Sequence, residues 1–275
     1  GYAVTQAPYP IISYKQAMLE FGCDKPDLRN PLRIIDVTDF FQKCTFKPFV
    51  GRTVRAIRVH AEMSKGFHEK LLKFATDMGM GGLGYLEVAE DMTYKGPIDK
   101  FIPEELKGQL AQIAALAAGD TIFFIADKEE RANYYAGQLR NELGDKLDLC
   151  EKNAYRFCYV NDFPMYEIDP ETKQLGFTHN PFSMPQGGLE ALETKNPLDV
   201  LAYQYDIVCN GVELSSGAVR NHDMQIMVKA FEIAGYTEED LKTKFGALYN
   251  AFQFGAPPHA GMAPGVDRMI MLLRN

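Results

Sequence analysis

The sequence predicts an α+β fold built around antiparallel sheet. Strand-like and helix-like segments follow one another without the regular strand–helix–strand repeat that builds a parallel sheet. An Asn210–Gly211 pair lies between two apolar runs, which is the strongest short-range signal for a hairpin of antiparallel strands. With 46% hydrophobic and 24% charged residues the composition is that of a globular protein, and 275 residues suffice for one large domain or two smaller ones.

The first half of the chain has recognisable helix and strand boundaries. Ser13 and Gln16 have the spacing of a capping box and predict a short helix that Gly22 closes. A helix is expected between Pro103 and Gly119, because proline favours the first helical turn and glycine the position after the end. The remaining pattern predicts strands at 52–59, 85–88 and 121–126, and helices at 67–78 and 128–143, the last one stopped at Gly144.

The second half begins with a predicted strand at 157–160 and continues as a turn-rich loop from 161 to 196. After the hairpin at 210–211, the apolar spacing predicts helices at 224–234 and 238–252. A segment rich in glycine and proline then leads into a final helix, whose amphipathic part is 269–273.

The charge balance is acidic, with a formal net charge of −8. This argues against a protein that binds nucleic acid mainly through bulk positive charge. One segment departs from the balance: residues 47–70 contain six Lys or Arg against two Glu. Such a cluster is either a solvated strand face or a patch that contacts phosphate groups.

The cysteines and apolar runs point to a reducing, cytoplasmic setting. The five cysteines are scattered and form no CxxC pair, and the five histidines show no zinc-ligand spacing, so no zinc site is expected. The apolar runs are much shorter than the ~20 residues of a membrane helix, and residues 1–10 lack the features of a secretion signal. Because the chain does not begin with Met, we expect its natural start to be missing.

The segment 79–84, GMGGLG, matches the pattern GxGxxG of dinucleotide-binding loops. That loop requires a strand before the glycines and a helix after them, so that phosphate meets the helix N-terminus. The expected order is reversed here, so the segment is interpreted as a turn.

The hairpin at 210–211 places two acidic residues near each other. A two-residue turn pairs Val208 with Glu213 and puts Asp206 opposite Ser215. Asp206 and Glu213 then project from the same face as diagonal neighbours, within roughly 7–8 Å at their Cα atoms. Two carboxylates so placed suit a Mg²⁺ ion that bridges phosphate oxygens, the alternative being two exposed acids on a solvated face.

Two further segments suggest contacts with a ligand. Gly217 allows a close backbone approach, and Arg220 follows it in an extended stretch from which its guanidinium could grip a carboxylate with two hydrogen bonds. In the segment 255–268, GAPPHAGMAPGVDR, the glycines would let a flat ligand lie on the backbone while Arg268 stacks on it or contacts phosphate. Taken alone, this segment reads equally as a loop before a helix.

Together these pieces resemble a bacterial-type aspartyl-tRNA synthetase, a member of the class II aminoacyl-tRNA synthetases. The resemblance covers nearly the whole chain, and its specificity comes from the order of the segments. It is carried by residues 14–29 with GCDKPDLR, 161–167 (NDFPMYE), 178–182 (THNPF), 205–220, and 255–268, which is similar to the family's third signature motif.

The resemblance implies an antiparallel catalytic sheet with flanking helices, interrupted by an inserted α+β domain. The catalytic domain is expected at residues 1–41 and 154–275 and the inserted domain at 42–153. The implied reaction joins ATP and L-aspartate into aspartyl-adenylate and then passes the aspartyl group to the terminal adenosine of tRNA(Asp), or also of tRNA(Asn). A cytoplasmic homodimer is implied for the full-length enzyme.

The resemblance also implies roles for individual residues. Asp206 and Glu213 would hold the Mg²⁺ ion bound to ATP. Arg220 would grip the side-chain carboxylate of aspartate and set specificity. The other expected contacts are His179 in a loop that covers the substrate, Gly217 beside aspartate, Gly265, Asp267 and Arg268 at ATP, and Gly261 as further backbone room.

The chain departs from the family pattern at Asn180, where a second histidine is common, at Ala260, where a glycine is common, and at Pro264. The family's first two motifs and its anticodon-binding barrel are absent, so we expect an incomplete, by itself inactive part of a longer enzyme. Two alternatives stay open: an asparaginyl- or lysyl-tRNA synthetase of the same subclass, and a non-catalytic remnant that binds tRNA or another partner.

Overall fold

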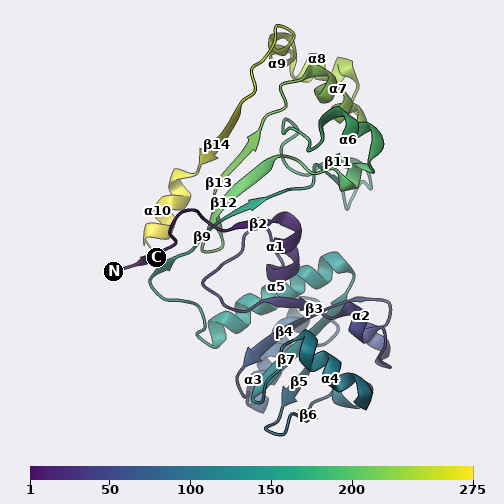
Figure 1. Ribbon diagram of the computed structural model, residues 1–275, viewed down its shortest axis with the longest axis vertical. Helices are drawn as coiled ribbons and strands as arrows, with labels where there is room; N and C mark the ends of the chain where they lie inside the picture. Colours follow the sequence, from purple (N-terminus) through teal and green to yellow (C-terminus); the bar gives the residue numbers. More distant parts are fainter. Residues whose placement is uncertain (275) are drawn as a thin grey trace. The chain divides into compact units, whose positions relative to one another are not determined.

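The computed structural model describes residues 1–274 and divides into two compact units (Figure 1). The first unit comprises residues 1–3 and 16–154, and the second comprises residues 4–15 and everything from 155 onward. Strands β1 (Ala3–Val4) and β8 (Ala154–Tyr155), which pair with each other, and helix α1 (Tyr14–Phe21) lie where the chain passes between the units.

The first unit contains a five-stranded antiparallel sheet. Its strand order is β3 (Ile34–Asp36), β4 (Thr53–His60), β7 (Asp120–Asp127), β5 (Gly84–Val88) and β6 (Tyr94–Lys95). The central strand β7 is apolar on both faces, because Phe123 and Ile125 alternate with Ile122 and Phe124 and all four are buried. This explains why its sequence is a continuous apolar run.

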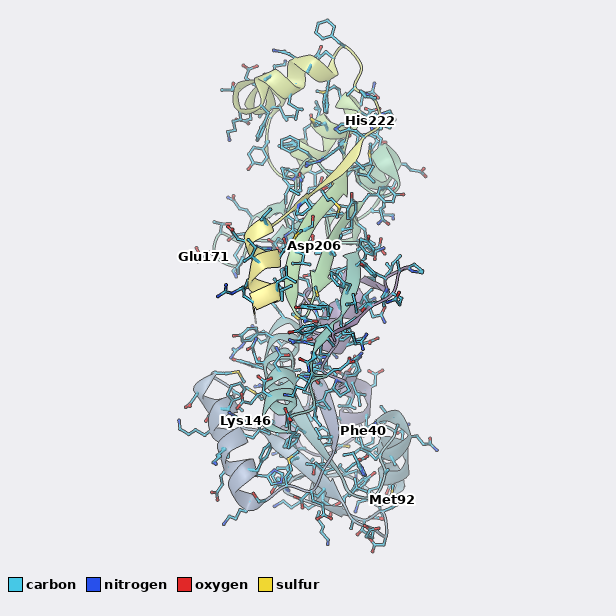
Figure 2. All side chains as sticks on the ribbon, turned by 90° about the vertical axis from the view of Figure 1, so that its left-hand side faces the viewer. Phe40, Met92, Lys146, Glu171, Asp206 and His222 are labelled. Atoms are coloured by element: carbon cyan, nitrogen blue, oxygen red, sulfur yellow. The ribbon has the colours of Figure 1, made fainter. Side chains whose placement is uncertain are left out.

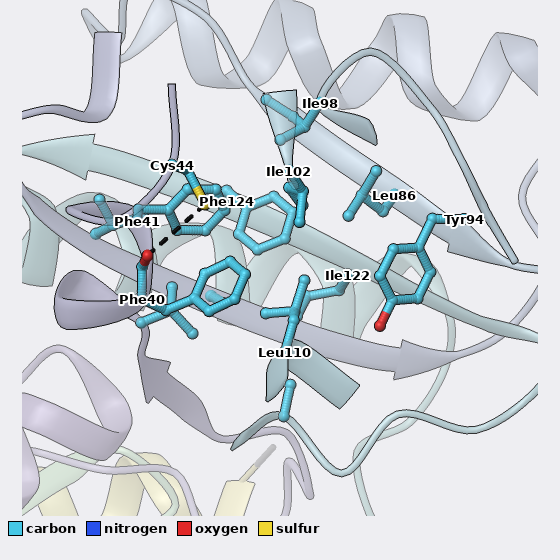
Figure 3. Packing of buried hydrophobic residues seen from close by; sticks show 14 of the residues in the cluster. Phe40, Phe41, Cys44, Leu86, Tyr94, Ile98, Ile102, Leu110, Ile122 and Phe124 are labelled. Atoms are coloured by element: carbon cyan, nitrogen blue, oxygen red, sulfur yellow. Dashed lines mark hydrogen bonds between the residues drawn. The ribbon is translucent and has the colours of Figure 1, made fainter. Parts of the chain in front are cut away.

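Helices cover both faces of this sheet. Helices α3 (Lys65–Asp77) and α5 (Glu129–Lys146) pack with Phe123 and Ile125 on one side. Helices α2 (Thr38–Phe41) and α4 (Glu104–Ile113) pack with Ile122 and Phe124 on the other, in the cluster drawn in Figure 3. Short 3₁₀ turns at Lys47–Phe49 and Asp99–Phe101 complete that second layer.

The second unit contains another five-stranded sheet, in the order β14 (Ala260–Pro264), β13 (Val212–Val219), β12 (Gln204–Cys209), β9 (Phe157–Asn161) and β2 (Ile11–Ser13). All neighbours are antiparallel except β2, which runs parallel to β9. The other elements of the unit are β10 (Tyr166–Ile168), β11 (Leu175–Phe177), α6 (Gly188–Thr194), a 3₁₀ turn (Pro197–Asp199), α7 (Met224–Ile233), α8 (Glu238–Lys244), α9 (Gly246–Phe252) and α10 (Val266–Arg274). In the core of this unit, burial raises the pKa of Tyr166, whose hydroxyl donates to the Ala230 carbonyl.

The antiparallel sheets and most of the predicted segments are confirmed, with four differences. Helix α4 ends at Ile113 and does not reach Gly119, because the chain turns through Ala115 at a φ of 50° before β7. The expected helix 238–252 is divided at Phe245 into α8 and α9, and the expected loop 161–196 contains β10, β11 and α6. Helix α5 continues past Gly144 to Lys146.

Gly144 does not stop α5 because its role is one of packing. A Cβ atom at this position would lie 2.3 Å from Nδ2 of Asn30, and that amide nitrogen is already bonded to the Arg140 carbonyl. The glycine is therefore explained by the close approach of Asn30 to the helix.

Replacing Gly144 with Ala is expected to lower the free energy of unfolding of the first unit by about 1–3 kcal/mol, although alanine is the better helix former. The matched control is Gly108→Ala in α4, where a Cβ would meet nothing within 4 Å. That change is expected to stabilise by up to about 1 kcal/mol. Hydrogen exchange of the β7 amides measures both variants, and the same sign for both would contradict the packing role.

The boundaries of the structural units differ from the predicted domain boundaries. Residues 1–3, 16–41 and 154, expected to belong to the catalytic domain, group with the first unit. The functional division at residues 42 and 153 stays a prediction. Among residues 1–274 no helix is both long enough and apolar enough to span a membrane.

Candidate functional site

The hairpin of β12 and β13 organises the candidate site. Asn210 and Gly211 have φ angles of 52° and 80°, which is the two-residue turn with positive φ at both positions that the sequence predicts. Next to the turn, Cys209 pairs with Val212 and Val208 pairs with Glu213, as expected.

Farther from the turn, the register differs from the prediction. Ile207 pairs with Ser215 and Asp206 pairs with Ser216, so the expectation that Asp206 lies opposite Ser215 is wrong. The cause is a β-bulge: Leu214 is an extra residue on β13, and its carbonyl accepts a hydrogen bond of 2.7 Å from the Gly265 N–H. Because the extra residue is on β13, Asp206 and Val208 still share a face, and Glu213 lies on that face with them.

Glu213 contacts the segment that follows β14. Nη1 of Arg268 lies 3.2 Å from Oε1 of Glu213 and donates a hydrogen bond of 2.7 Å to the Glu213 carbonyl. Arg268 is in the first turn of α10, directly after Gly265 has bonded to the bulge. The predicted hairpin and the predicted final motif are therefore joined by direct contacts.

Asp206 lies one step farther along the same face of the sheet, on β12 (Figure 2). It is only 4% exposed, which is unusual for a carboxylate. Buried carboxylates are retained where hydrogen bonds or cations stabilise them. On this face Asp206 pairs with Ser216, and the next pair away from the turn is Gln204 with Ala218.

Arg220 continues the row on that face, two residues beyond Ala218. Its backbone is held on both sides, by a bridge to Ser183 and by a hydrogen bond of 2.9 Å from its N–H to the His259 carbonyl. Asp206 is paired with Ser216, and Arg220 is four positions farther along the chain than Ser216. At ~3.3 Å per residue, Asp206 and Arg220 are therefore about 13 Å apart along the sheet. Within residues 1–274 the guanidinium has neither a hydrogen bond nor an ion pair.

Gly217 lies on the opposite face of the sheet. A Cβ there would lie 2.6 Å from both the Gly261 carbonyl oxygen and Cε2 of Tyr205, and 2.9 Å from Cβ of Met262. Gly217 thus lets three strands and the Tyr205 ring pack closely, and its expected contact with aspartate stays a prediction.

His179 and Asp267 are exposed and lie apart from these contacts. The His179 ring meets the Phe163 ring edge-on, with 5.2 Å between centroids, in the loop after β11. Asp267 is in the first turn of α10, where a negative charge is favoured by the helix dipole. Within the described residues neither side chain has a hydrogen bond or ion pair to Arg220 or Arg268.

The three positions that depart from the family pattern have simple structural roles. The Asn180 side chain accepts a hydrogen bond from the Phe182 N–H and so shapes its own loop. Ala260 and Pro264 are the first and last residues of β14, opposite Val219 and Ser215. Gly261, paired with Ala218, has no atom within 4 Å of a Cβ position, which leaves open space.

The sequence reasoning missed a group of buried polar residues beside Arg220. Ser183 and Asn221 are 0% and 1% exposed, and neither the Ser183 hydroxyl nor Nδ2 of Asn221 has a hydrogen-bond partner within residues 1–274. Oγ1 of Thr178 and Nδ1 of His222, which Figure 2 labels, are buried atoms without a hydrogen-bond partner there as well, on two residues that are themselves half-buried. Buried polar atoms require a partner, so a polar ligand or water belongs here. Their only sequence signal is that they adjoin the segment 178–182 and Arg220.

The described residues contain no group of three or more His, Cys, Asp or Glu side chains that could hold a metal ion. Asp206 and Glu213 are two carboxylates on one face of the sheet, and their expected role as ligands of a Mg²⁺ ion stays a prediction.

In the first unit, the basic segment 47–70 is only partly available to a ligand. Arg55 is buried and lies 2.7 Å from Asp36, and Arg58 lies 3.6 Å from Asp120. The glycine segment 79–84 is the turn that the sequence predicts, because it follows α3 and precedes β5.

Comparisons with known proteins agree with the resemblance seen in the sequence. The family model for class II tRNA synthetases (D, K and N) matches residues 3–275. The chain is 52% identical over 272 residues to the aspartate–tRNA(Asp/Asn) ligase of Ehrlichia chaffeensis, covering 96% of this chain and 46% of that protein. It is 49% identical over 281 residues to the ligase of the same name from Rickettsia africae, with 98% and 47% covered.

One similar solved structure is the aspartyl tRNA synthetase from Entamoeba histolytica, at 18% identity and a TM-score of 0.32, covering 80% of this chain and 40% of that one. The chain spans about half the length of the curated relatives it matches.

Proposed function

This chain belongs to the class II tRNA synthetases of the D, K and N group, and we propose that it carries the aspartate-activating site of an aspartate–tRNA ligase. The reaction has two steps. The α-carboxylate of L-aspartate, not its side-chain carboxylate, attacks the α-phosphorus of ATP to give aspartyl-adenylate and pyrophosphate. The 3′-terminal adenosine of tRNA then takes the aspartyl group and AMP leaves.

The observation that carries this proposal is the row of charges on one face of the second sheet. Arg268 and Glu213 are in contact at one end, Asp206 lies between, and Arg220 is about 13 Å beyond Asp206. An adenylate joins a nucleotide to an amino acid end to end and needs a site of this kind, with phosphate chemistry at one end and a carboxylate grip at the other. Adenylation depends on positioning and charge stabilisation, so no protein nucleophile is required.

At the nucleotide end, Asp206 and Glu213 would hold the Mg²⁺ ion, and Arg268 would contact ATP. Bound there, Mg²⁺ would neutralise phosphate charge and fix the orientation of the phosphates. Gly265 brings the start of α10 against the bulge at Leu214, and Asp267 in the same turn belongs to the proposed ATP site.

At the aspartate end, Arg220 would bind the side-chain carboxylate of the substrate with both arms of its guanidinium. Its guanidinium has no acidic partner within residues 1–274, and Ser183 and Asn221 beside it have unpartnered polar atoms. Gly217 and His179 would lie next to the bound amino acid, His179 within a loop that covers it.

The partners follow from the same proposal. The relatives are named for tRNA(Asp/Asn), so we propose that the acceptor is tRNA(Asp) and also tRNA(Asn). We further propose that residues 42–153 form an inserted domain within a catalytic domain made of 1–41 and 154–275, that the whole enzyme is a homodimer, and that it works in the cytoplasm.

Aspartate-dependent exchange of pyrophosphate into ATP tests the proposal. We expect exchange in the whole protein as its gene encodes it and none with residues 1–275 alone, because the chain spans about half of its relatives' length. Exchange with residues 1–275 alone would contradict the proposal that this chain is inactive by itself. If asparagine or lysine supported exchange and aspartate did not, the proposal would be replaced by a sister enzyme of the same subclass. Absence of exchange with aspartate, asparagine and lysine alike would favour a non-catalytic remnant that binds tRNA or another partner.

A further inference from the structure

A cavity of about 580 Å³ opens within the first unit, and none of its lining residues belongs to the candidate site. Four segments line it: residues 46–52, 80–84, 97–101 and 124–127. Three of its lining residues, Phe49, Ile98 and Phe124, belong to the core cluster of which Figure 3 draws a part, so the cavity rests on well-packed side chains.

One wall of the cavity is aromatic. The Phe46 ring lies 4.6 Å from the Phe101 ring and 4.7 Å from the Phe49 ring, measured between centroids. Phe49 is buried, whereas Phe46 and Phe101 are only half-buried. The exposed parts of these two rings offer a flat apolar surface of the kind on which a nucleobase stacks.

Two cations beside this wall are available to an anion. Within residues 1–274 neither Arg52 nor Lys100 has a carboxylate within ion-pair distance, and the Lys100 ammonium lies 5.1 Å from the centre of the Phe101 ring. The lining also contains one acid, Asp127. Its carboxylate is already engaged, by Nε of Arg131 at 3.4 Å and by the Lys128 N–H at 2.7 Å.

The glycine segment supplies hydrogen-bond donors. The backbone N–H groups of Gly81, Gly82 and Leu83 have no hydrogen-bond partner among the described residues, and a Cβ on either glycine would meet nothing within 4 Å. Because α3 precedes the segment and β5 follows it, phosphate cannot meet a helix N-terminus here as in a dinucleotide-binding fold. Any anion must be held by the free amides and the two side-chain cations.

We propose that this cavity binds a nucleoside phosphate, with the base against Phe46 and Phe101 and the phosphate between Arg52, Lys100 and the amides of residues 81–83. The apolar wall alone would accept any apolar group, and the two free cations alone any anion. Their combination within one cavity selects a ligand that carries both a flat ring and a phosphate. Such a group is either a free mononucleotide or an unpaired nucleotide of an RNA strand.

Uridine 5′-monophosphate is the first probe, because uracil is not the base of the adenylation reaction. Titrated into residues 1–275, it is expected to shift the NMR signals of the amides of Gly81, Gly82 and Leu83. Uridine without phosphate is expected to bind about tenfold more weakly, and Arg52→Glu is expected to weaken the nucleotide by about tenfold or more. Phe46→Leu keeps an apolar side chain and removes the ring, so it is expected to weaken both probes.

The matched control is Lys70→Glu. Lys70 belongs to the same basic segment, has no ion pair among the described residues and does not line the cavity, so the variant changes the net charge by the same amount as Arg52→Glu. Its affinity for the nucleotide is expected to stay within about twofold of the unmodified chain. If both variants lost affinity for the nucleotide equally, the loss would come from the change in net charge, and the proposed site would be wrong.

A short oligouridylate distinguishes the two sources of the ligand. If RNA is the source, the oligonucleotide binds at least about tenfold more tightly than the mononucleotide, and Arg52→Glu lowers the slope of log affinity against log salt by about one. If free nucleotides are the source, the two probes bind equally. Failure of both probes to shift residues 81–83 would overturn the proposal, and pyrophosphate exchange in the whole protein would be unaffected by that result.

Discussion

Replacing Arg220 with Lys in the whole protein is expected to lower kcat/KM for aspartate about 100-fold in pyrophosphate exchange and to leave KM for ATP within about twofold. Arginine meets a carboxylate with two parallel hydrogen bonds from a planar fork, whereas lysine offers one compact charge. Arg220 lies about 13 Å from Asp206, so its replacement does not touch the nucleotide end of the row. The backbone bonds to Ser183 and His259 do not depend on the side chain, and the fold should survive.

Arg131→Lys is the matched control for this prediction. Arg131 is an exposed residue of α5 in the first unit, with Asp127 at 3.4 Å and the Tyr135 hydroxyl at 2.7 Å as its partners. The same substitution there should leave both kinetic constants unchanged. Near-normal activity of Arg220→Lys with aspartate would remove Arg220 from the substrate pocket. An equal loss for ATP and aspartate would instead mean that Arg220 supports the structure of the sheet.

The sequence predicts those parts of the fold and site that depend on local patterns. The apolar run of β7 identifies a strand buried on both faces, and the Asn210–Gly211 pair identifies the turn. Side-chain parity along a strand then puts Asp206 and Glu213 on one face, which the observed register confirms. These inferences need only residues that are close in sequence.

What the sequence does not predict depends on contacts between distant residues. The bulge at Leu214 is bonded to Gly265, and Gly144 is required by Asn30 on another segment. The burial of Ser183 and Asn221 beside Arg220 likewise arises only when three segments meet. Local sequence preferences carry no information about such contacts. The sequence therefore does not predict the register of β12 and β13, the end of α5 or the buried polar residues beside Arg220.

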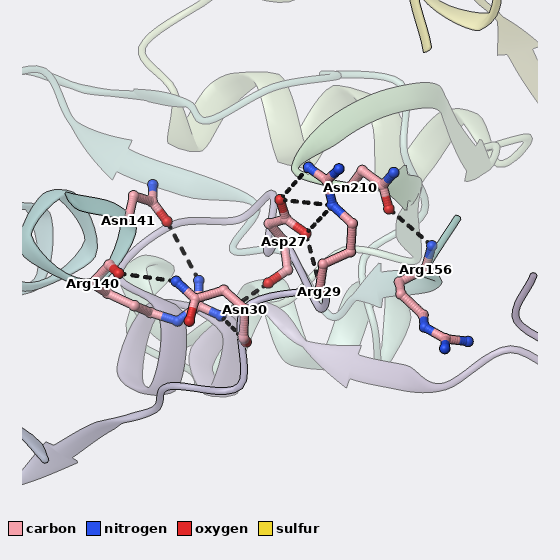
Figure 4. Close-up of polar contacts among 7 residues, drawn as sticks. All are labelled: Asp27, Arg29, Asn30, Arg140, Asn141, Arg156 and Asn210. Carbon is pink, nitrogen blue, oxygen red and sulfur yellow. Dashed lines mark hydrogen bonds and ion pairs between the residues drawn. The ribbon is translucent and has the colours of Figure 1, made fainter. Parts of the chain in front are cut away.

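The burial of Arg140 also depends on contacts between distant residues, and the sequence does not predict it. Among the described residues Arg140 is the largest fully buried side chain. From α5 its guanidinium donates to the carbonyls of Leu32 at 2.7 Å, Asp27 at 2.9 Å and Asn30 at 2.7 Å (Figure 4). In the opposite direction, the side-chain amide of Asn30 donates a hydrogen bond of 2.9 Å to the Arg140 carbonyl. These bonds hold the irregular segment 27–32, which leads into β3, against the helix. Asp27 is itself ordered by an ion pair of 2.7 Å with Arg29.

Replacing Arg140 with Met is expected to lower the free energy of unfolding of the first unit by about 2–4 kcal/mol, and two opposing effects decide the value. Burial lowers the pKa of Arg140 from 12.5 to about 10, which is worth roughly 3 kcal/mol against the charged form, and methionine removes that penalty. Methionine also removes three hydrogen bonds from a charged donor, at about 1.5–3 kcal/mol each, and this larger effect should prevail. The Leu32 and Asn30 carbonyls keep Nη1 of Arg33 as a donor, at 2.9 Å and 3.1 Å, which limits the loss. Hydrogen exchange of the β7 amides measures the result. The control is Arg131→Met on the exposed side of α5, which loses one ion pair with Asp127 and one hydrogen bond to the Tyr135 hydroxyl and should lower stability by about 1 kcal/mol. A stabilised Arg140→Met variant would show that the buried charge costs more than its three hydrogen bonds return, and that segment 27–32 is held by packing alone.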